Sequence, residues 1–100
     1  LFLLKNVVMK RDHLADVIIP IIHLVNSGNS HADAIRVVAE NQKYSNTSTC
    51  YERCTRHLGF DSIDQFWEKV HSDKIAEHLI HMFPERKYLI EKELRGLIFR

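Results

Sequence analysis

Apolar residues recur at helical spacing along most of this chain, and short polar clusters separate the apolar segments. The segment 31–42 is the clearest case, because its apolar residues fall three and four positions apart, on one side of a helix. That stripe consists of Ala34, Ile35, Val38 and Ala39. Ser30 precedes it, and a serine hydroxyl at this position accepts a backbone N–H of the first turn. We therefore expect a helix that begins after Ser30.

The segment 12–26 has the same spacing, but a proline interrupts it. Its apolar stripe consists of Leu14, Val17, Ile18, Ile21, Ile22 and Val25. Asp12 is a suitable N-cap, whereas Pro20 in a helix interior costs ~3 kcal/mol. The pattern predicts a helix that is kinked at Pro20 or begins again there. A strand is the alternative, because Val and Ile favour strands, although proline argues against a strand too.

A polar turn at Tyr44–Asn46 leads to a second helix, which we expect over 47–58. Its inward stripe, with a spacing of four residues, consists of Cys50, Cys54 and Leu58. Gly59 is a fitting residue just past its C-terminus. Two signals compete for its start: an N-cap at Asn46 and a capping box at Thr49–Glu52.

Three further helices are expected in the C-terminal part of the chain. A capping box at Ser62–Gln65 opens the first, with inward residues Ile63, Phe66, Trp67 and Val70. Asp73 is expected to cap the second, with inward residues Ile75, Leu79, Ile80 and Phe83. Pro84 ends that helix and opens the last one, whose apolar residues are Tyr88, Leu89, Leu94, Leu97 and Ile98. Glu91 and Arg95 are spaced for an ion pair on it.

These segments predict an all-α fold, a compact bundle of five or six short helices in a single domain over residues 1–100. One hundred residues, 45% of them apolar, are enough for one ordinary domain with its own core. The segment 1–10 stays open between a strand, a first helix and the tail of a preceding segment. Because the chain begins with leucine rather than methionine, we expect it to be part of a longer protein.

The charges are nearly balanced, with 14 Lys and Arg against 13 Asp and Glu and a formal net charge of +1. This balance excludes a polybasic arm and gives no global field towards DNA or a membrane. The segment 61–83 has two Lys against five Asp and Glu, a net charge of −3, whereas 43–60 has three Lys and Arg against one Glu, a net charge of +2. Residues 84–100 also carry +2. An anionic partner would meet one of these two positive segments.

The chain contains no apolar run near the ~20 residues that a membrane helix needs, so we expect no membrane partner. Its only cysteines, Cys50 and Cys54, are neighbours on one helix face, which is poor geometry for a disulfide. This cysteine usage indicates a reducing compartment, and we expect a cytoplasmic protein.

Cys50, Cys54 and His57 also form a C-x3-C-x2-H pattern that could bind zinc, with His78 or His81 as a fourth ligand. A single helix is a poor source of three tetrahedral ligands, and buried cysteine behaves as a small apolar residue. We therefore expect no metal and no cofactor. A thiol next to an imidazole also suggests a nucleophile and its base, but no elbow, glycine-rich loop or acidic pair accompanies them. We expect no enzymatic activity in this domain, although a parent protein could have one.

The outward positions of the segment 47–58 are polar or cationic, and such side chains contact phosphates and base edges. We expect phosphate contacts from Lys43, Thr47, Arg53 and Arg56. We expect base contacts from Ser48, Thr49, Glu52 or Arg53.

The stretch AIRVVAENQKYSNTSTCYERCTRHLG resembles the helix-turn-helix DNA-binding superfamily over about residues 31–59. Ala39 is a small residue where the two helices would approach, and Tyr44 is an apolar anchor in the turn. The resemblance implies a helix-turn-helix-like unit whose second helix lies in the major groove of double-stranded DNA. It suggests the targeting domain of a larger bacterial regulator or nuclease.

The alternative is a helical protein–protein interaction or dimerisation domain with no nucleic-acid contact. The apolar residues of 1–10 and of the last helix would then face a second copy or a neighbouring domain of the same chain. Low net charge favours this alternative, whereas the polar outer face of 47–56 favours DNA. The two are compatible, since helix-turn-helix proteins commonly pair to read two half-sites.

Overall fold

The computed structural model describes residues 12–95, and in this range it contains helices and no strands. The six α-helices are α2 (Ile19–Asn26), α3 (His31–Asn41), α4 (Ser48–Cys54), α5 (Ile63–His71), α6 (Ile75–Met82) and α7 (Lys87–Leu94). A π-helix, η1 (Leu14–Ile18), precedes them, and two 3₁₀ turns, η2 (Arg56–Leu58) and η3 (Pro84–Arg86), lie between them. The all-α prediction with five or six helices is confirmed. The segment 1–10 lies outside the described residues.

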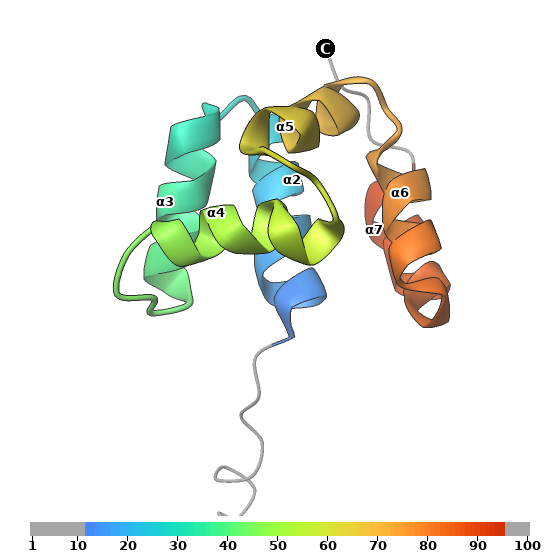
Figure 1. The fold of residues 1–100 in the computed structure, drawn as a ribbon, viewed down its shortest axis with the longest axis horizontal. Helices are drawn as coiled ribbons and strands as arrows, with labels where there is room; N and C mark the ends of the chain where they lie inside the picture. The colour runs from blue at the N-terminus through green and yellow to red at the C-terminus, as the bar shows by residue number, and fades with distance from the viewer. Residues whose placement is uncertain (1–11, 96–100) are drawn as a thin grey trace, which may run out of the picture.

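Helix α2 lies at the centre of the bundle (Figure 1). It contacts α3 on one side and α7 on the other, while α4 crosses the front of the bundle and contacts α3, η1 and α5. The core takes large side chains from most of the helices, and Ile18 of η1, Ile22 of α2 and Phe66 of α5 are among those that are fully buried. Helix α4 therefore rests on a packed layer, which holds its outer face in place.

The π-helix accommodates Pro20. A proline ring collides with the carbonyl four residues earlier and supplies no N–H, so a regular helix through this position would be strained. Here the wider π turns end at Ile18, and α2 begins with Pro20 in its first turn, where a missing N–H is tolerated. The helix runs on from η1 into α2 without a break, so it does not begin again at Pro20; the irregularity expected there is the π-helical segment that precedes the proline. Asp12 acts as a cap, since its Oδ1 accepts the Ala15 N–H at 3.2 Å.

The predicted caps have mixed outcomes. Ser30 caps α3 as expected, because its hydroxyl accepts the Asp33 N–H at 3.1 Å. Ser62 makes no side-chain cap bond, and Gln65 instead accepts the Asp61 N–H at 2.8 Å, so the expected capping box is wrong in part. Asp73 does not cap α6: its φ of +63° places it in the left-handed turn that ends α5.

The apolar stripe of the last helix is confirmed in part. Leu94 is buried and Leu89 packs against the core as expected, and Ile90 is buried as well. Tyr88, which was also expected to face the core, is 80% exposed. The expected ion pair on this helix is present, with Arg95 Nη2 2.9 Å from Glu91 Oε2. Leu97 and Ile98 lie outside the described residues.

Candidate nucleic-acid interface

Helix α4 follows α3 after a short turn and runs across it (Figure 1). The Tyr44 N–H donates to the Ala39 carbonyl at 2.9 Å, which closes the end of α3. Asn46 Oδ1 then accepts the Ser48 N–H at 3.0 Å and starts α4, so the earlier of the two predicted starts is observed. Ala39 is buried and Tyr44 half-buried at this turn.

The expected helix 47–58 is shorter than predicted, because α4 ends at Cys54 and a 3₁₀ turn follows. The Thr55 hydroxyl donates to the Tyr51 carbonyl at 3.0 Å, and the Phe60 N–H donates to the Thr55 carbonyl at 2.9 Å. Gly59, with a φ of +82°, lets the chain reverse here. The predicted inward stripe is nevertheless confirmed, since Cys50, Cys54 and Leu58 are all fully buried.

We refer to the seven predicted contact residues together as the α4 surface. Five of them are exposed, namely Lys43, Thr47, Ser48, Glu52 and Arg56. The other two, Thr49 and Arg53, are half-buried. Lys43 has a φ of +60°, so it lies in the tight turn that leads out of α3 rather than on the helix. The structure thus places all seven on or beside α4.

The cationic part of the α4 surface surrounds a shallow hollow with a volume of about 260 Å³, lined by Glu52, Arg53, Arg56 and His57. Arg56 is 79% exposed, and its Nη1 lies 3.4 Å from Glu52 Oε2. Arg53 Nε is buried and has no hydrogen-bond partner among the described residues. The charge of Arg56 is thus partly neutralised by its surface ion pair with Glu52. The Nε–H of Arg53 is a buried donor that no acceptor among the described residues satisfies.

The Cys50, Cys54 and His57 pattern does not form a site. Both thiols are buried in the core, and burial, followed by the neighbouring Cys50, raises the pKa of the Cys54 thiol. His57 lies in the 3₁₀ turn after α4, where it is exposed and lines the hollow with Arg53 and Arg56. Since metal binding and nucleophilic attack both need a thiolate, this arrangement suits neither. The cysteines serve as core residues.

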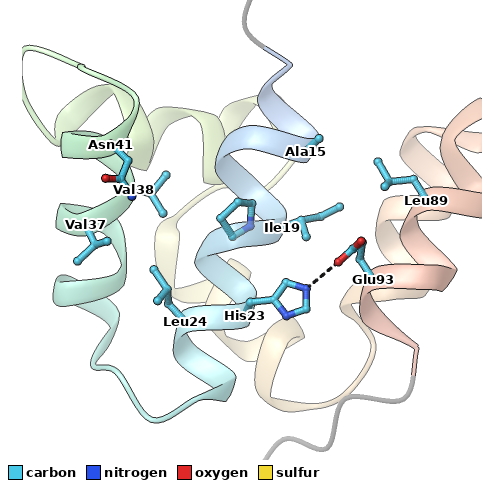
Figure 2. Close-up of a pocket in the computed structure, with 10 residues that line it drawn as sticks. Ala15, Ile19, His23, Leu24, Val37, Val38, Asn41, Leu89 and Glu93 are labelled. Carbon is cyan, nitrogen blue, oxygen red and sulfur yellow. Dashed lines mark ion pairs between the residues drawn. The ribbon is translucent and has the colours of Figure 1, made fainter.

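A second concave surface, the α2–α3–α7 groove, lies on the opposite side of α2 from α4 (Figure 2). Its volume is about 530 Å³, and it is lined largely by apolar side chains, including Ile19, Pro20, Leu24 and Leu89. His23 and Glu93 point towards one another at one end of it, with Nε2 3.3 Å from Oε1. The sequence gives no sign of this groove, because a local pattern of residues does not show that the back of α2 lies uncovered between α3 and α7.

The structure also brings together His31 and His71, which are 40 residues apart in sequence. Their Nε2 atoms are 2.8 Å apart, and the His31 ring stacks on Trp67. Burial, together with the nearby His71, lowers the pKa of His31. Because the two histidines are far apart in sequence, only the packing of α3 against the end of α5 reveals this pair.

Comparison with protein-family models, with curated proteins and with solved structures finds no match to this chain. Among residues 12–95, no helix combines the length and the apolarity that crossing a bilayer requires.

Proposed function

We propose that this domain binds nucleic acid, with double-stranded DNA as the partner, through the α4 surface. The observation that carries the proposal is the grouping of Arg53, Arg56 and His57 around one hollow on a helix whose opposite face is fixed in the core. Guanidinium groups make strong, directional hydrogen bonds to phosphate oxygens. A backbone phosphate is the ligand whose charge and acceptors fit this group.

The hydroxyls at the start of α4 give the surface a second element. Thr47 and Ser48 are exposed at the N-terminal end of α4, whereas Arg53 lies near its C-terminal end and Arg56 in the turn that follows. Such groups contact phosphates or base edges when a helix meets a groove. We assign the phosphate contacts to Lys43, Thr47, Arg53 and Arg56, and the base contacts to Ser48, Thr49, Glu52 or Arg53.

In this proposal, the ion pair between Glu52 and Arg56 opens when DNA binds. Both side chains are mostly exposed, so the pair contributes little to stability and can open at small cost. When DNA binds, Arg56 exchanges the carboxylate for a phosphate, and Glu52 is released towards the base edges, where it can accept from a cytosine amino group. Glu52→Gln should therefore tighten non-specific binding and weaken discrimination between sequences.

The test is a DNA-binding titration of the double variant Arg53→Ala/Arg56→Ala at several salt concentrations. Each lost phosphate contact should reduce the slope of log affinity against log salt by about 0.9, so the double variant should lose up to about 1.8. The matched control is Lys87→Ala/Lys92→Ala, which removes the same charge from exposed positions on α7. An isotherm that is the same in the double variant and the wild type would exclude the α4 surface as the contact.

The α2–α3–α7 groove supports a second candidate, association through helices, with a second copy of the chain as the partner. Its apolar lining leaves the back of α2 uncovered between α3 and α7. Pairing would also place two α4 surfaces on one assembly, as proteins that read two half-sites require. Sedimentation across a concentration series tests this candidate. Leu89→Glu should abolish a dimer, whereas the exposed Lys92→Glu should not; a wild-type monomer at all concentrations would exclude it.

A further inference from the structure

His31 and His71 lie at facing helix ends, His31 at the first position of α3 and His71 at the last position of α5. Their Nε2 atoms are 2.8 Å apart and their ring centroids 5.1 Å apart, so the rings meet nearly head-on. One Nε2–H donates to the other Nε2, and a single proton lies between the rings. Two imidazole nitrogens this close, on two different helices, are a potential metal-ligand pair.

One of the two rings is held in place and the other can adjust. The His31 ring stacks on Trp67 with a centroid distance of 3.9 Å and an interplanar angle of 8°. It is half-buried, and Trp67 itself is buried in the core. His71 is exposed, so its side chain can turn without disturbing the packing. A site with one fixed ligand and one adjustable ligand needs little rearrangement to close on an ion.

The separation of the nitrogens indicates which ions fit. With metal–nitrogen distances of about 2.0–2.1 Å, two ligands at a right angle lie ~2.9 Å apart and two tetrahedral ligands ~3.4 Å apart. The two nitrogens are hydrogen-bonded at 2.8 Å, so a right-angled pair of ligands needs a turn of His71 and almost no change in their separation, whereas a tetrahedral pair also needs them to move apart. Right-angled nitrogen ligands are typical of square-planar or octahedral sites, which Cu²⁺ and Ni²⁺ prefer.

We propose that His31 and His71 bind a divalent transition-metal ion of tetragonal geometry, Cu²⁺ or Ni²⁺, through their two Nε2 atoms. Among residues 12–95 no group of three or more His, Cys, Asp or Glu side chains is placed to hold a metal ion, so water completes the coordination. The ring that donates in the metal-free pair moves its proton from Nε2 to Nδ1, and His71 turns until both lone pairs converge. When both rings are neutral, binding releases no net proton. The ion then ties the start of α3 to the end of α5.

The chain contains a built-in reporter of this site, because Trp67 is its only tryptophan and carries the His31 ring on its face. Cu²⁺ bound to His31 would lie close to the indole ring on which His31 stacks, and a paramagnetic ion at short range quenches indole fluorescence. We expect titration of the full chain with copper sulfate to quench Trp67 emission saturably, and a chelator to restore it. An absence of quenching in the wild type would overturn the proposal.

The decisive variant is His71→Asn, which removes one ligand from an exposed position and leaves the stack of His31 on Trp67 intact. We expect its apparent dissociation constant for Cu²⁺ to rise at least about tenfold. The matched control is His81→Asn, an exposed histidine on α6, which should titrate like the wild type. Equal affinity of His71→Asn and the wild type would overturn the proposal, because the ion would then bind elsewhere.

Electron paramagnetic resonance of the Cu²⁺ complex supplies a readout that is independent of stability. The wild type should show two nitrogen ligands and His71→Asn one. Ni²⁺ should also raise the melting temperature of the wild type and not that of His71→Asn, since an ion that binds only the folded chain stabilises it. A spectrum with the same nitrogen count in both proteins would contradict the pairing of the two rings.

Discussion

Arg86 forms a bidentate ion pair with Asp12, the first residue that the structure describes. Its Nη1 lies 3.2 Å from Asp12 Oδ1 and its Nη2 lies 2.9 Å from Asp12 Oδ2. The two residues are 74 positions apart, so the pair ties the start of η1 to the turn η3 between α6 and α7. Since Asp12 also accepts the Ala15 N–H, one carboxylate both caps a helix and holds the C-terminal pair of helices against it.

The first prediction concerns this pair. Arg86→Met should lower the free energy of unfolding by about 0.5–1 kcal/mol, because the pair is partly exposed and solvent screens it. Asp12→Asn should lose a similar amount, since asparagine keeps the cap, whereas Asp12→Ala should lose about 1 kcal/mol more. Urea unfolding of the single and double variants measures the coupling. A sum of single effects equal to the double effect would show that the pair contributes nothing.

The same pair predicts a pH dependence. The hydrogen bond from Arg86 holds the pKa of the Asp12 carboxyl below its ordinary value of 3.8. A carboxyl with a lowered folded pKa stabilises the fold above its unfolded pKa, and this stabilisation is lost as the pH falls through the folded value. The wild type should therefore lose more stability than Arg86→Met between about pH 5 and about pH 2. If the urea midpoints of the two proteins fell by equal amounts over this range, Arg86 would not be the cause of the lowered pKa of Asp12.

The helix caps give a prediction with an internal control. Ser30→Ala removes the hydroxyl that accepts the Asp33 N–H and should cost about 1 kcal/mol, or about 4 °C in melting temperature. Ser62→Ala should change stability by less than about 0.5 kcal/mol, because Ser62 makes no side-chain cap bond. Thermal unfolding followed by circular dichroism compares the two. Equal losses would mean that Ser62 caps α5 in solution after all.

We expect the thiols of Cys50 and Cys54 to react slowly in the folded chain, because both are buried. Burial raises the pKa of the Cys54 thiol and also blocks access to it. The folded chain should therefore react with Ellman's reagent at least about 100-fold more slowly than the chain in urea, where both thiols are free to react. Ser48→Cys, which places a thiol on the exposed α4 surface, should react at once. Rapid labelling of the folded wild type would place a cysteine at the surface.

The local pattern of the sequence was sufficient for most helices. The stripe of Ala34, Ile35, Val38 and Ala39 is buried as predicted, and Ser30 forms the expected cap. The stripe of Cys50, Cys54 and Leu58 is also buried, even though the helix that was expected to carry it ends at Cys54. Such features depend on residues within about four positions of each other, so the sequence alone contains the information that decides them.

The errors occur at the ends of helices, where several local signals compete. Tyr88 is exposed in the first turn of α7, and Asp73 adopts the left-handed turn that ends α5 instead of capping α6. For the candidate interface, the seven contact residues stay a prediction, and the sequence did not show that Glu52 pairs with Arg56 or that Arg53 keeps a buried, unbonded Nε among the described residues. Those details depend on how the chain bends after Cys54.

By itself, the sequence determined an all-α bundle, the approximate place of each helix, and a positively charged segment with polar outer residues at 43–60. The tertiary structure alone decided which residues meet across the bundle: Asp12 with Arg86, and His31 with both His71 and Trp67. The physical reason is the range of the interactions. Helix propensity, capping and amphipathic spacing act within one or two turns, whereas these contacts exist only after the helices have packed around the shared core and fixed their orientations.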